Sequence, residues 1–489
     1  MTFALGRARL PVWRPRRPRD RVLVALGVLL GVGLALRVWF LLVWSPALIG
    51  YSDSGVYFHG AVSSLWSDPI RTVGYSMFLR VLHFIAPHLL LVIIVQHLLG
   101  LLAAALIFLT VRRCGGPRAL GLAPAAIIAI GGDQLFLEHA ALSDSLFTFL
   151  VIAMLYCAVR STQGGARWAA AAGACVGLGV WDRGAGVVMV PVITLWLLFS
   201  SGKPTRRTLA AGLLALVVSL ATIQTYVEWR HAASGLTGLT TNNNWNLYTR
   251  VAPWADCRKF TPPPATRRLC EATPPSRRVP TDYVFGPASP AYRLFGPAFL
   301  VTKYPHAMSL LRRFSEAAIL GQPLDYLHAV WRDAVRLFYP NRRSYGGLSP
   351  RELIGWLQYG PNMRSGSNEF VDYWRHRLYP HDPAPHRGAV GPLKRWERIT
   401  RIDGVWMAIL LVLALAGPWL AVSPTRAGAA LFAATALTLI FFPIFVKDYD
   451  YRFLIPAFAP LLAAGALAVW GLYARLGVLL ERRSRAARA

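Results

Sequence analysis

Ionisable residues at the ends of long apolar runs are the groups in this chain that could carry chemistry. They are Asp53, Asp133, Glu138, Asp144, Asp182, Arg183, Lys447, Asp448 and Arg452. Arg and Lys in short connections mark the cytoplasmic side, and by this rule these groups fall at outer ends. Ionisable groups at membrane depth are costly and usually functional. We therefore predict a reaction centre at the outer membrane surface, because a carrier would need polar groups through the middle of the membrane.

Asp53 is the first candidate for a catalytic group. It follows the first apolar run in Tyr51-Ser52-Asp53-Ser54-Gly55-Val56-Tyr57. Burial there would raise its pKa toward neutrality, where a carboxylate acts as a general base. Ser-Asp-Ser also commonly starts a helix, so an N-cap is the alternative. Tyr57, Arg71 and Tyr75 follow as substrate-binding candidates, and Tyr75 either contacts a lipid chain or sugar or anchors the segment at the interface.

A second set of acids surrounds the turn between residues 133 and 144. Asp144 opens a returning helix in Leu142-Ser143-Asp144-Ser145-Leu146-Phe147. Pairing with the helix N-terminus is the alternative to a catalytic role there. Together with Asp53 it could bind a divalent cation through oxygen ligands, which is the one cofactor that the sequence leaves open. Glu138 in the same turn is a further substrate-binding candidate.

Two arginines and a lysine are the candidates for binding an anion. Arg183 stands between two apolar runs, and its planar guanidinium suits the paired oxygens of a phosphate. The alternatives are a neighbour pair with Asp182 or snorkelling, the latter also open to Arg37. Otherwise Asp182 is a substrate-binding candidate. Lys447 and Arg452 repeat the pattern between the last two apolar runs.

The elements that must position these residues are membrane-spanning helices. The chain of 489 residues is 55% hydrophobic and 15% charged, which is too apolar for a soluble protein. We predict an all-α polytopic membrane protein with about ten spans and both ends in the cytoplasm. The expected spans are 22–43, 89–111, 119–131, 142–159, 168–181, 187–199, 208–227, 405–420, 427–446 and 453–473. Arginines that tag the two ends as cytoplasmic are Arg7, Arg9, Arg14, Arg16, Arg17, Arg19, Arg475, Arg482, Arg483, Arg485 and Arg488.

The spans divide the chain into three parts. Residues 1–228 form an N-terminal transmembrane catalytic module, whose first outer loop, 44–88, carries short interfacial helices. Residues 229–404 form a mixed extracytoplasmic domain, with helical periodicity at 306–320 and 324–338. Residues 405–489 supply the last helices and a cytoplasmic tail. Cys257 and Cys270 lie close together in the outer domain, so a local disulfide is expected, with two free thiols as the alternative.

The net charge of +29 does not indicate a nucleic-acid partner. Much of the charge lies in short loops and tails, where the positive-inside rule explains it, and the rest suits anionic lipid headgroups or phosphates. No nucleic-acid motif is present. The sequence also lacks a convincing internal repeat, which counts against an inverted-repeat transporter.

The ordered set of motifs resembles the GT-C superfamily of integral-membrane glycosyltransferases. The resemblance extends to bacterial members of the protein O-mannosyltransferase and aminoarabinose transferase clan, family 39-like. The resemblance covers about 34–183 and 447–456. Asp53 stands where the family has the acid of its first outer loop. The resemblance implies a GT-C-like helical bundle in the bacterial plasma membrane with an extracytoplasmic active site.

Four further segments resemble family motifs with substitutions. Arg71 to Leu79 resembles Pro-Gly-Tyr-Pro-Leu, but Val73 and Ser76 replace the prolines. Leu142 to Phe147 resembles Ser-Glu-Ser-Leu-Phe, with Asp144 in place of Glu. Leu178 to Arg183 resembles a helix ending in Arg-Pro, with Gly184 in place of Pro. Asp450 to Pro456 resembles Arg-Tyr-x-x-Pro, with Phe453 in place of Tyr.

The resemblance implies a mechanism and partners. The implied donor is a polyprenyl-phosphate monosaccharide, and the implied acceptor is a cell-envelope glycan, lipid or protein. By this resemblance Asp53 would deprotonate the acceptor hydroxyl, which would attack the anomeric carbon with inversion. Arg183, Arg452 and Lys447 would stabilise the leaving phosphate, and Asp144 would orient the site or share a metal.

Three other functions stay open from the sequence. A polysaccharide polymerase or ligase that uses a lipid-diphosphate donor also has arginines and acids in an outer loop. A polytopic transporter or flippase would need polar groups through the midplane, where the spans hold mainly Arg37, Gln96, His97 and Gln224. A membrane scaffold whose outer domain binds cell-wall polymer would need no catalytic acid.

Overall fold

The computed structural model describes residues 21–278, 286–297, 303–339, 348–359 and 368–486. These residues are mostly helical. The predicted N-terminal arginine cluster and Arg488 lie outside the described residues, as does the side chain of Arg482. Within the described residues, the helices that are long and apolar enough to span a membrane number six. They are α1 (Arg21–Val43), α4 (Leu89–Arg113), α7 (Asp144–Gln163), α10 (Arg206–Ser234), α20 (Arg426–Val446) and α21 (Ile455–Ala486), the last preceded by the 3₁₀ turn η7 (Tyr451–Leu454). The predicted all-α polytopic class is therefore confirmed.

Two bent helix pairs raise the number of candidate spans to eight, which is below the predicted ten. In the first pair, η1 (Arg118–Gly121) and α5 (Leu122–Ala129) meet α6 (Gly132–Glu138) at 48°, and in the second, α18 (Gly391–Thr400) meets α19 (Gly404–Leu420) at 41°. The expected spans at 168–181 and 187–199 fold as α8 (Ala166–Asp182) and as η2 (Gly184–Val188) with α9 (Met189–Phe199). Both are short: the 17 residues of α8 rise about 26 Å, against a hydrocarbon core of about 30 Å.

Short helices cover the end of the bundle that carries the predicted first outer loop, 44–88, and we call this end the outer end after that prediction. This loop forms α2 (Ser52–Val62) and α3 (Gly74–Ile85), as predicted. The helices expected at 306–320 and 324–338 are found as α14 (Pro305–Gly321) and as α15 (Pro323–Val335) with η6 (Arg336–Phe338). The other outer elements are α11 (Asn242–Val251), η3 (Pro264–Leu269), η4 (Pro275–Arg277), α12 (Pro290–Phe295), α16 (Pro350–Tyr359) and α17 (Glu369–Leu378). The described strands β1 (Trp44–Ser45) and β2 (His386–Arg387) pair antiparallel.

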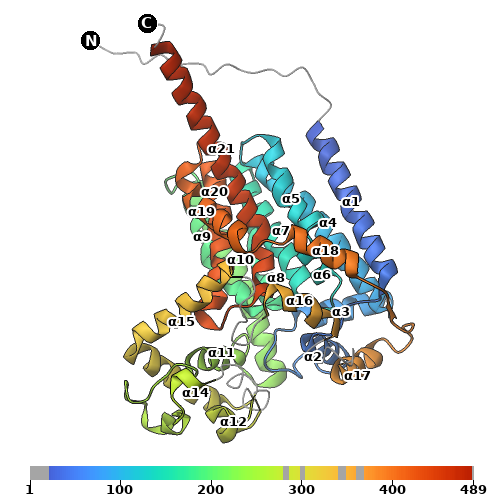
Figure 1. The fold of residues 1–489 in the computed structure, drawn as a ribbon, viewed down its shortest axis with the longest axis vertical. Coiled ribbons are helices and arrows are strands. Elements are labelled where there is room, and N and C mark those ends of the chain that lie inside the picture. Colours follow the sequence, from blue (N-terminus) through green and yellow to red (C-terminus); the bar gives the residue numbers. More distant parts are fainter. Residues whose placement is uncertain (1–20, 279–285, 298–302, 340–347, 360–367, 487–489) are drawn as a thin grey trace.

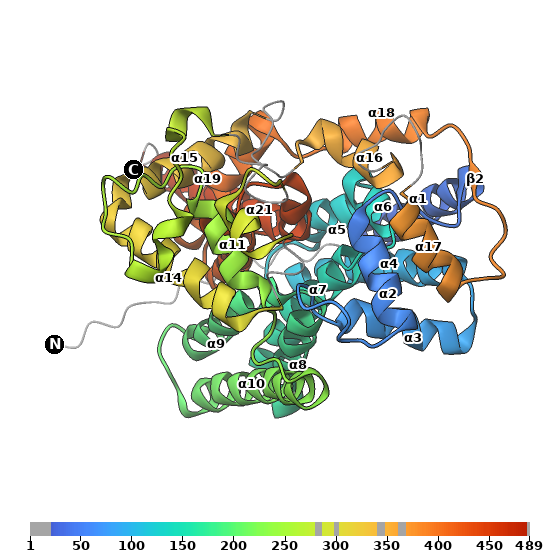
Figure 2. The same ribbon diagram turned by 90° about the horizontal axis from the view of Figure 1, so that it is seen from below.

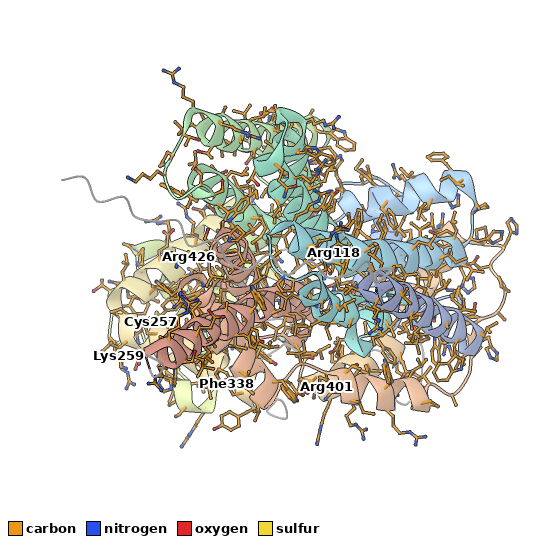
Figure 3. All side chains as sticks on the ribbon, turned by 90° about the horizontal axis from the view of Figure 1, so that it is seen from above. Arg118, Cys257, Lys259, Phe338, Arg401 and Arg426 are labelled. Carbon is orange, nitrogen blue, oxygen red and sulfur yellow. A yellow bond between two sulfur atoms is a disulfide. The ribbon has the colours of Figure 1, made fainter. Side chains whose placement is uncertain are left out.

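The ribbon places the two ends of the bundle clearly. Helix α1 begins and α21 ends at the upper end in Figure 1, whereas α11, α12 and α14 lie at the lower end. Figure 2 views that lower end and shows two groups of outer helices, α11, α14 and α15 on one side and α2, α3, α16 and α17 on the other, with α7 between them. Figure 3 views the opposite end, where Arg118 and Arg426 mark the starts of η1 and α20.

The segment 229–404 contributes to two hydrophobic cores. A small core around Trp245, Tyr248, Leu311 and Phe314 joins α11 to α14, and Cys257 and Cys270 form a disulfide beside it. Residues of α15 to α18, in contrast, belong to the large core of the bundle. The second half of the segment is therefore packed against the membrane helices and covers the bundle's outer end.

Candidate active site

Two carboxylates and three guanidinium groups meet at this outer end. Arg452 donates from Nη1 to Asp53 Oδ2 at 3.0 Å, and from Nε and Nη2 to Asp144 Oδ2 at 2.9 and 2.6 Å. Arg71 donates to the other oxygen of Asp53, and Arg183 to the other oxygen of Asp144. We call Asp53, Arg71, Asp144, Arg183 and Arg452 the carboxylate–guanidinium cluster. Its central member, Arg452, is 2% exposed.

Helix ends and one turn position these side chains. Asp53 lies in the first turn of α2, and Asp144 is the first residue of α7. Neither carboxylate caps its helix, because the N-cap positions are Tyr51 and Ser143 and neither cap makes a side-chain hydrogen bond. The alternative of a plain N-cap at Asp53 therefore does not describe this structure. Both carboxylates instead turn toward the arginines.

The arginines are held by backbone contacts at the ends of their elements. Arg183 follows α8 in an extended conformation, and its N–H donates to Gly179 O at 2.8 Å. Arg452 lies in η7, where its N–H donates to Asp450 Oδ1 at 3.0 Å. The neighbour pair of Asp182 and Arg183, the alternative to anion binding, is absent from the hydrogen bonds of the described residues, since Arg183 bonds to Asp144 instead.

The charge state of Asp53 differs from the expectation. Burial alone would raise the pKa of its carboxyl, but the guanidinium groups of Arg71 and Arg452 outweigh burial and hold the pKa below its ordinary value. The prediction of a raised pKa was therefore wrong, because it counted burial without the two arginines. Burial and the Asp53 charge raise the pKa of Tyr57 to about 12, so this phenol remains a proton donor.

The cluster has a basic, partly accessible side. The Arg71 and Arg183 side chains are 29% and 17% exposed, unlike the buried Arg452. Lys447 lies near them: its Nζ is 5.0 Å from the centre of the Phe453 ring, and Arg183 Cζ is 5.2 Å from the same centre. Three arginines thus contact two carboxylates, whereas Lys447 Nζ lies 4.0 Å from Asp448 Oδ1. The excess positive charge of the cluster suits an anion such as a phosphate.

Asp182 is buried next to this site without a hydrogen-bond partner. It is 2% exposed, and neither carboxylate oxygen is bonded within the described residues. Its own backbone oxygen accepts from Thr72 Oγ1 at 2.8 Å. A buried polar group without a partner is costly, so Asp182 is suited to take hydrogen bonds from a ligand.

Glu138, which was predicted as a substrate-binding residue, does not join the cluster. Its two oxygens accept from Arg37 Nη2 and Nε at 2.9 and 2.8 Å, and His97 Nδ1 lies 3.0 Å from Oε2. Arg37 is 1% exposed and so does not snorkel. The bend between α5 and α6 turns Glu138 into the bundle, where a charge is tolerated because it is paired.

The two predicted tyrosines lie between this internal network and the cluster. Tyr75 OH donates to Gln96 Oε1 at 2.6 Å, and Gln96 Nε2 donates to the Glu138 carbonyl at 2.7 Å. Tyr57 OH lies 3.1 Å from Ser143 Oγ and its ring packs edge-on against Tyr75. Both tyrosines are buried and support the elements that carry the cluster.

Tyr51 also belongs to the site, although its role could not be predicted from the sequence. The Arg452 guanidinium lies over its ring at 4.5 Å from the centre, a cation–π contact that fixes the arginine between the two carboxylates. The only sequence signal for this role is that Tyr51 stands two positions before Asp53.

The carboxylates of Asp53 and Asp144 do not fit a divalent cation in this arrangement. All four of their oxygens accept hydrogen bonds from guanidinium groups, and positive neighbours repel a cation. The described residues also hold no group of three or more His, Cys, Asp or Glu placed to bind a metal.

Solved structures with a similar chain fold include those of an archaeal enzyme. The apo crystal structure of the oligosaccharyltransferase from Archaeoglobus fulgidus matches with 14% identity and a TM-score of 0.45, covering 95% of this chain and 52% of that one. The oligosaccharyltransferase AglB from Archaeoglobus fulgidus, in complex with an inhibitory peptide and a dolichol-phosphate, matches with 15% identity and a TM-score of 0.44, with the same coverage. The chain thus spans about half the length of these structures. No curated protein matches it.

A protein-family model matches part of the chain. Residues 73–229 match the family described as dolichyl-phosphate-mannose-protein mannosyltransferase. The match runs from α3 through α10 and includes Asp144, Asp182 and Arg183. This match indicates a glycosyltransferase and confirms, over these residues, the resemblance of the chain to the GT-C superfamily of membrane glycosyltransferases.

Proposed function

We propose that this protein is a membrane glycosyltransferase that moves a monosaccharide from a polyprenyl-phosphate donor to an acceptor hydroxyl on the extracytoplasmic face. The observation that carries the proposal is the position of Arg452, which contacts Asp53 and Asp144 at once. A general base and an anion-binding group thus lie within hydrogen-bond distance of each other. Such transfer needs the base to take the proton of the acceptor and the anion-binding group to stabilise the leaving phosphate.

In the proposed reaction, Asp53 takes the proton of the acceptor hydroxyl. The acceptor oxygen forms a bond to the anomeric carbon, and the bond between that carbon and the phosphate oxygen breaks. The electron pair leaves with the polyprenyl phosphate, and attack from the opposite face inverts the carbon. Arg183, Arg452 and Lys447 stabilise the phosphate as its charge develops, and Asp144 holds Arg183 and Arg452 in place.

Donor binding would also activate the base. Without donor, Arg71 and Arg452 occupy both oxygens of Asp53 and lower its pKa. A phosphate that takes a hydrogen bond from either arginine frees one carboxylate oxygen for the acceptor. The pKa of Asp53 then rises because a compensating anion weakens the field of the guanidinium groups. Asp53 would be a competent base only when the donor is bound.

Asp182 is our candidate for contact with the sugar. Its carboxylate is buried and lacks a protein partner among the described residues, and it adjoins Arg183 in the chain. Sugar hydroxyl groups are donors that would satisfy it. Substituting Asn for Asp182 is therefore expected to weaken donor discrimination more than it weakens folding.

The proposed orientation follows from the distribution of basic residues. Helix α4 ends at Arg112 and Arg113, and Lys203, Arg206 and Arg207 lie in or beside the connection between α9 and α10. The cluster lies at the other ends of the helices, where α7 begins and α8 ends. The positive-inside rule places the basic connections in the cytoplasm. The cluster would then face the outside of the bacterial plasma membrane.

A donor panel tests this function. Purified protein in proteoliposomes is given radiolabelled polyprenyl-phosphate monosaccharides and, in parallel, polyprenyl-diphosphate oligosaccharides, with a mixed cell-envelope fraction as acceptor. We expect transfer or slow hydrolysis from at least one monophosphate donor and none from the diphosphates. Turnover of diphosphate donors alone would instead support the polymerase or ligase. Movement of intact donor across the bilayer, without cleavage, would support a flippase.

A further inference from the structure

The outer helix α15 has an uncovered apolar face. Leu324, Leu327, Trp331 and Phe338 recur at helical spacing and are all exposed, with Leu324 78% and Trp331 67% accessible. We call these four residues the α15 apolar face. Exposed apolar side chains that cluster on one face mark an interaction surface.

The opposite side of α15 is already packed. Ala329, Val330 and Asp333 are buried, and Asp333 accepts from Arg250 of α11 and forms an ion pair with Arg336 at 3.1 Å. The helix is thus apolar on the side that faces away from its protein neighbours. This is the reverse of the usual surface helix, whose polar side faces water.

The position of α15 points to the occupant of this face. Tyr326 OH donates to Phe445 O at 3.0 Å, which ties α15 to the outer end of the membrane helix α20. In Figure 1, α15 lies between the lower ends of the bundle helices and α14. The helix therefore lies at the level where the membrane spans end.

The apolar face also continues an exposed apolar surface of a membrane helix. The turn η6, which carries Phe338, packs against α19, and α19 exposes Val405, Trp406 and Ile409 at the same outer end. Figure 3 labels Phe338 near the rim of the molecule. A tryptophan such as Trp331 among aliphatic residues is typical of the headgroup level of a bilayer.

We propose that the α15 apolar face inserts into the outer leaflet of the membrane and anchors the outer domain there. Interfacial helices bind in this way, with the apolar side placed at the boundary of headgroups and acyl chains. The anchor would hold α15 against Phe445, which lies just before the segment that leads to Arg452 of the cluster. This inference does not depend on the proposed reaction.

Fluorescence quenching in lipid nanodiscs tests the anchor. Leu324→Cys in the full chain is labelled with an environment-sensitive fluorophore, after subtraction of labelling in the unsubstituted protein. The nanodiscs contain phosphatidylcholine with a doxyl quencher near the headgroup, and iodide serves as the aqueous quencher. Arg312→Cys, an exposed position on α14, is the matched control.

We expect the label at 324 to be quenched more by doxyl lipid than by iodide, and the label at 312 to show the reverse order. Equal iodide quenching at the two positions would overturn the proposal, because the face would then lie in water. Protection from both quenchers would also overturn it and indicate a second copy or another protein as the cover. Leu327→Cys gives an independent reading if Leu324→Cys does not fold.

Discussion

Arg452 is the residue on which the site depends, because it bonds two carboxylates with one side chain. Lysine keeps the charge but lacks the planar fork that reaches both Asp53 and Asp144. We predict that Arg452→Lys lowers transfer by about 10²–10³-fold, the usual effect of removing one well-placed donor. The measurement is the initial rate of sugar transfer at saturating donor, together with thermal unfolding.

Arg401 offers a matched control for this substitution. It forms a partly buried two-point ion pair with Glu397, at 2.5 and 2.7 Å, outside the cluster. Arg401→Lys should therefore lower the unfolding temperature comparably without a matching loss of transfer. The role assigned to Arg452 would be contradicted if both variants showed the same loss of transfer for the same fall in unfolding temperature.

Asp448 gives a prediction about pH. Burial raises the pKa of its carboxyl from 3.8 to about 6, and Asp450 adds to this effect while Lys447 opposes it. Between these values the folded protein holds a proton that the unfolded chain has lost. Stability contributed by this group is therefore present below the unfolded pKa and is lost as pH rises through about 6. The loss amounts to at most about 3 kcal/mol.

Asp448→Asn removes this titration and tests the sign. The variant should be more stable than the parent at about pH 8 and nearly equal to it at about pH 4. Chemical unfolding across this range measures the difference, with Asp372→Asn on α17 as a partly exposed control. A stability difference between Asp448→Asn and the parent that does not change with pH would contradict the buried, protonated state.

At the scale of elements, the contact of α3 with α8 positions one side of the site. A Cβ at Gly74 would lie 2.5 Å from Trp181 O and 2.6 Å from Asp182 N. These are backbone atoms, so they cannot turn aside. We predict that Gly74→Ala destabilises the protein by about 1–3 kcal/mol and lowers transfer as well, because it displaces the end of α8 that carries Asp182 and Arg183.

Gly27→Ala on α1 is the control, because a Cβ there meets nothing within 4 Å. It should stabilise the protein by no more than about 1 kcal/mol, because Ala favours a helix over Gly. Thermal unfolding in one detergent compares both variants with the parent. Equal effects of the two substitutions would mean that the close approach of α3 to α8 does not constrain the site.

The depth of a site residue in the membrane could be predicted from the sequence, but the direction of its side chain could not. Charges at the outer ends of apolar runs identified Asp53, Asp144, Arg183 and Arg452, and the structure brings these together. The same criterion selected Glu138, which points into the bundle toward Arg37. Membrane depth can be inferred from flanking charges, but the direction in which a side chain points depends on the bend before α6. The pairing of Arg71 with Asp53 likewise depends on the path of the outer loop.

At the scale of the whole molecule, the sequence predicted the class and most spans but not the packing of the outer segment. Apolar runs and basic connections are local signals, so α1, α4, α7, α10 and α20 could be located directly. The outer helices α16 and α17 escaped prediction because their apolar residues face the core of the bundle, which lies far away in the sequence. Their placement reflects tertiary contacts rather than a local pattern.

The central claim is that Asp53 is the base of a transfer from a polyprenyl-phosphate sugar. The most direct measurement is transfer of radiolabelled sugar in proteoliposomes by the parent, by Asp53→Asn and by Asp325→Asn, whose exposed carboxylate pairs with Lys259. We predict that Asp53→Asn lowers transfer by about 10²–10⁴-fold, with donor still bound, and that Asp325→Asn transfers like the parent. Transfer by Asp53→Asn at the parent's rate would contradict the claim.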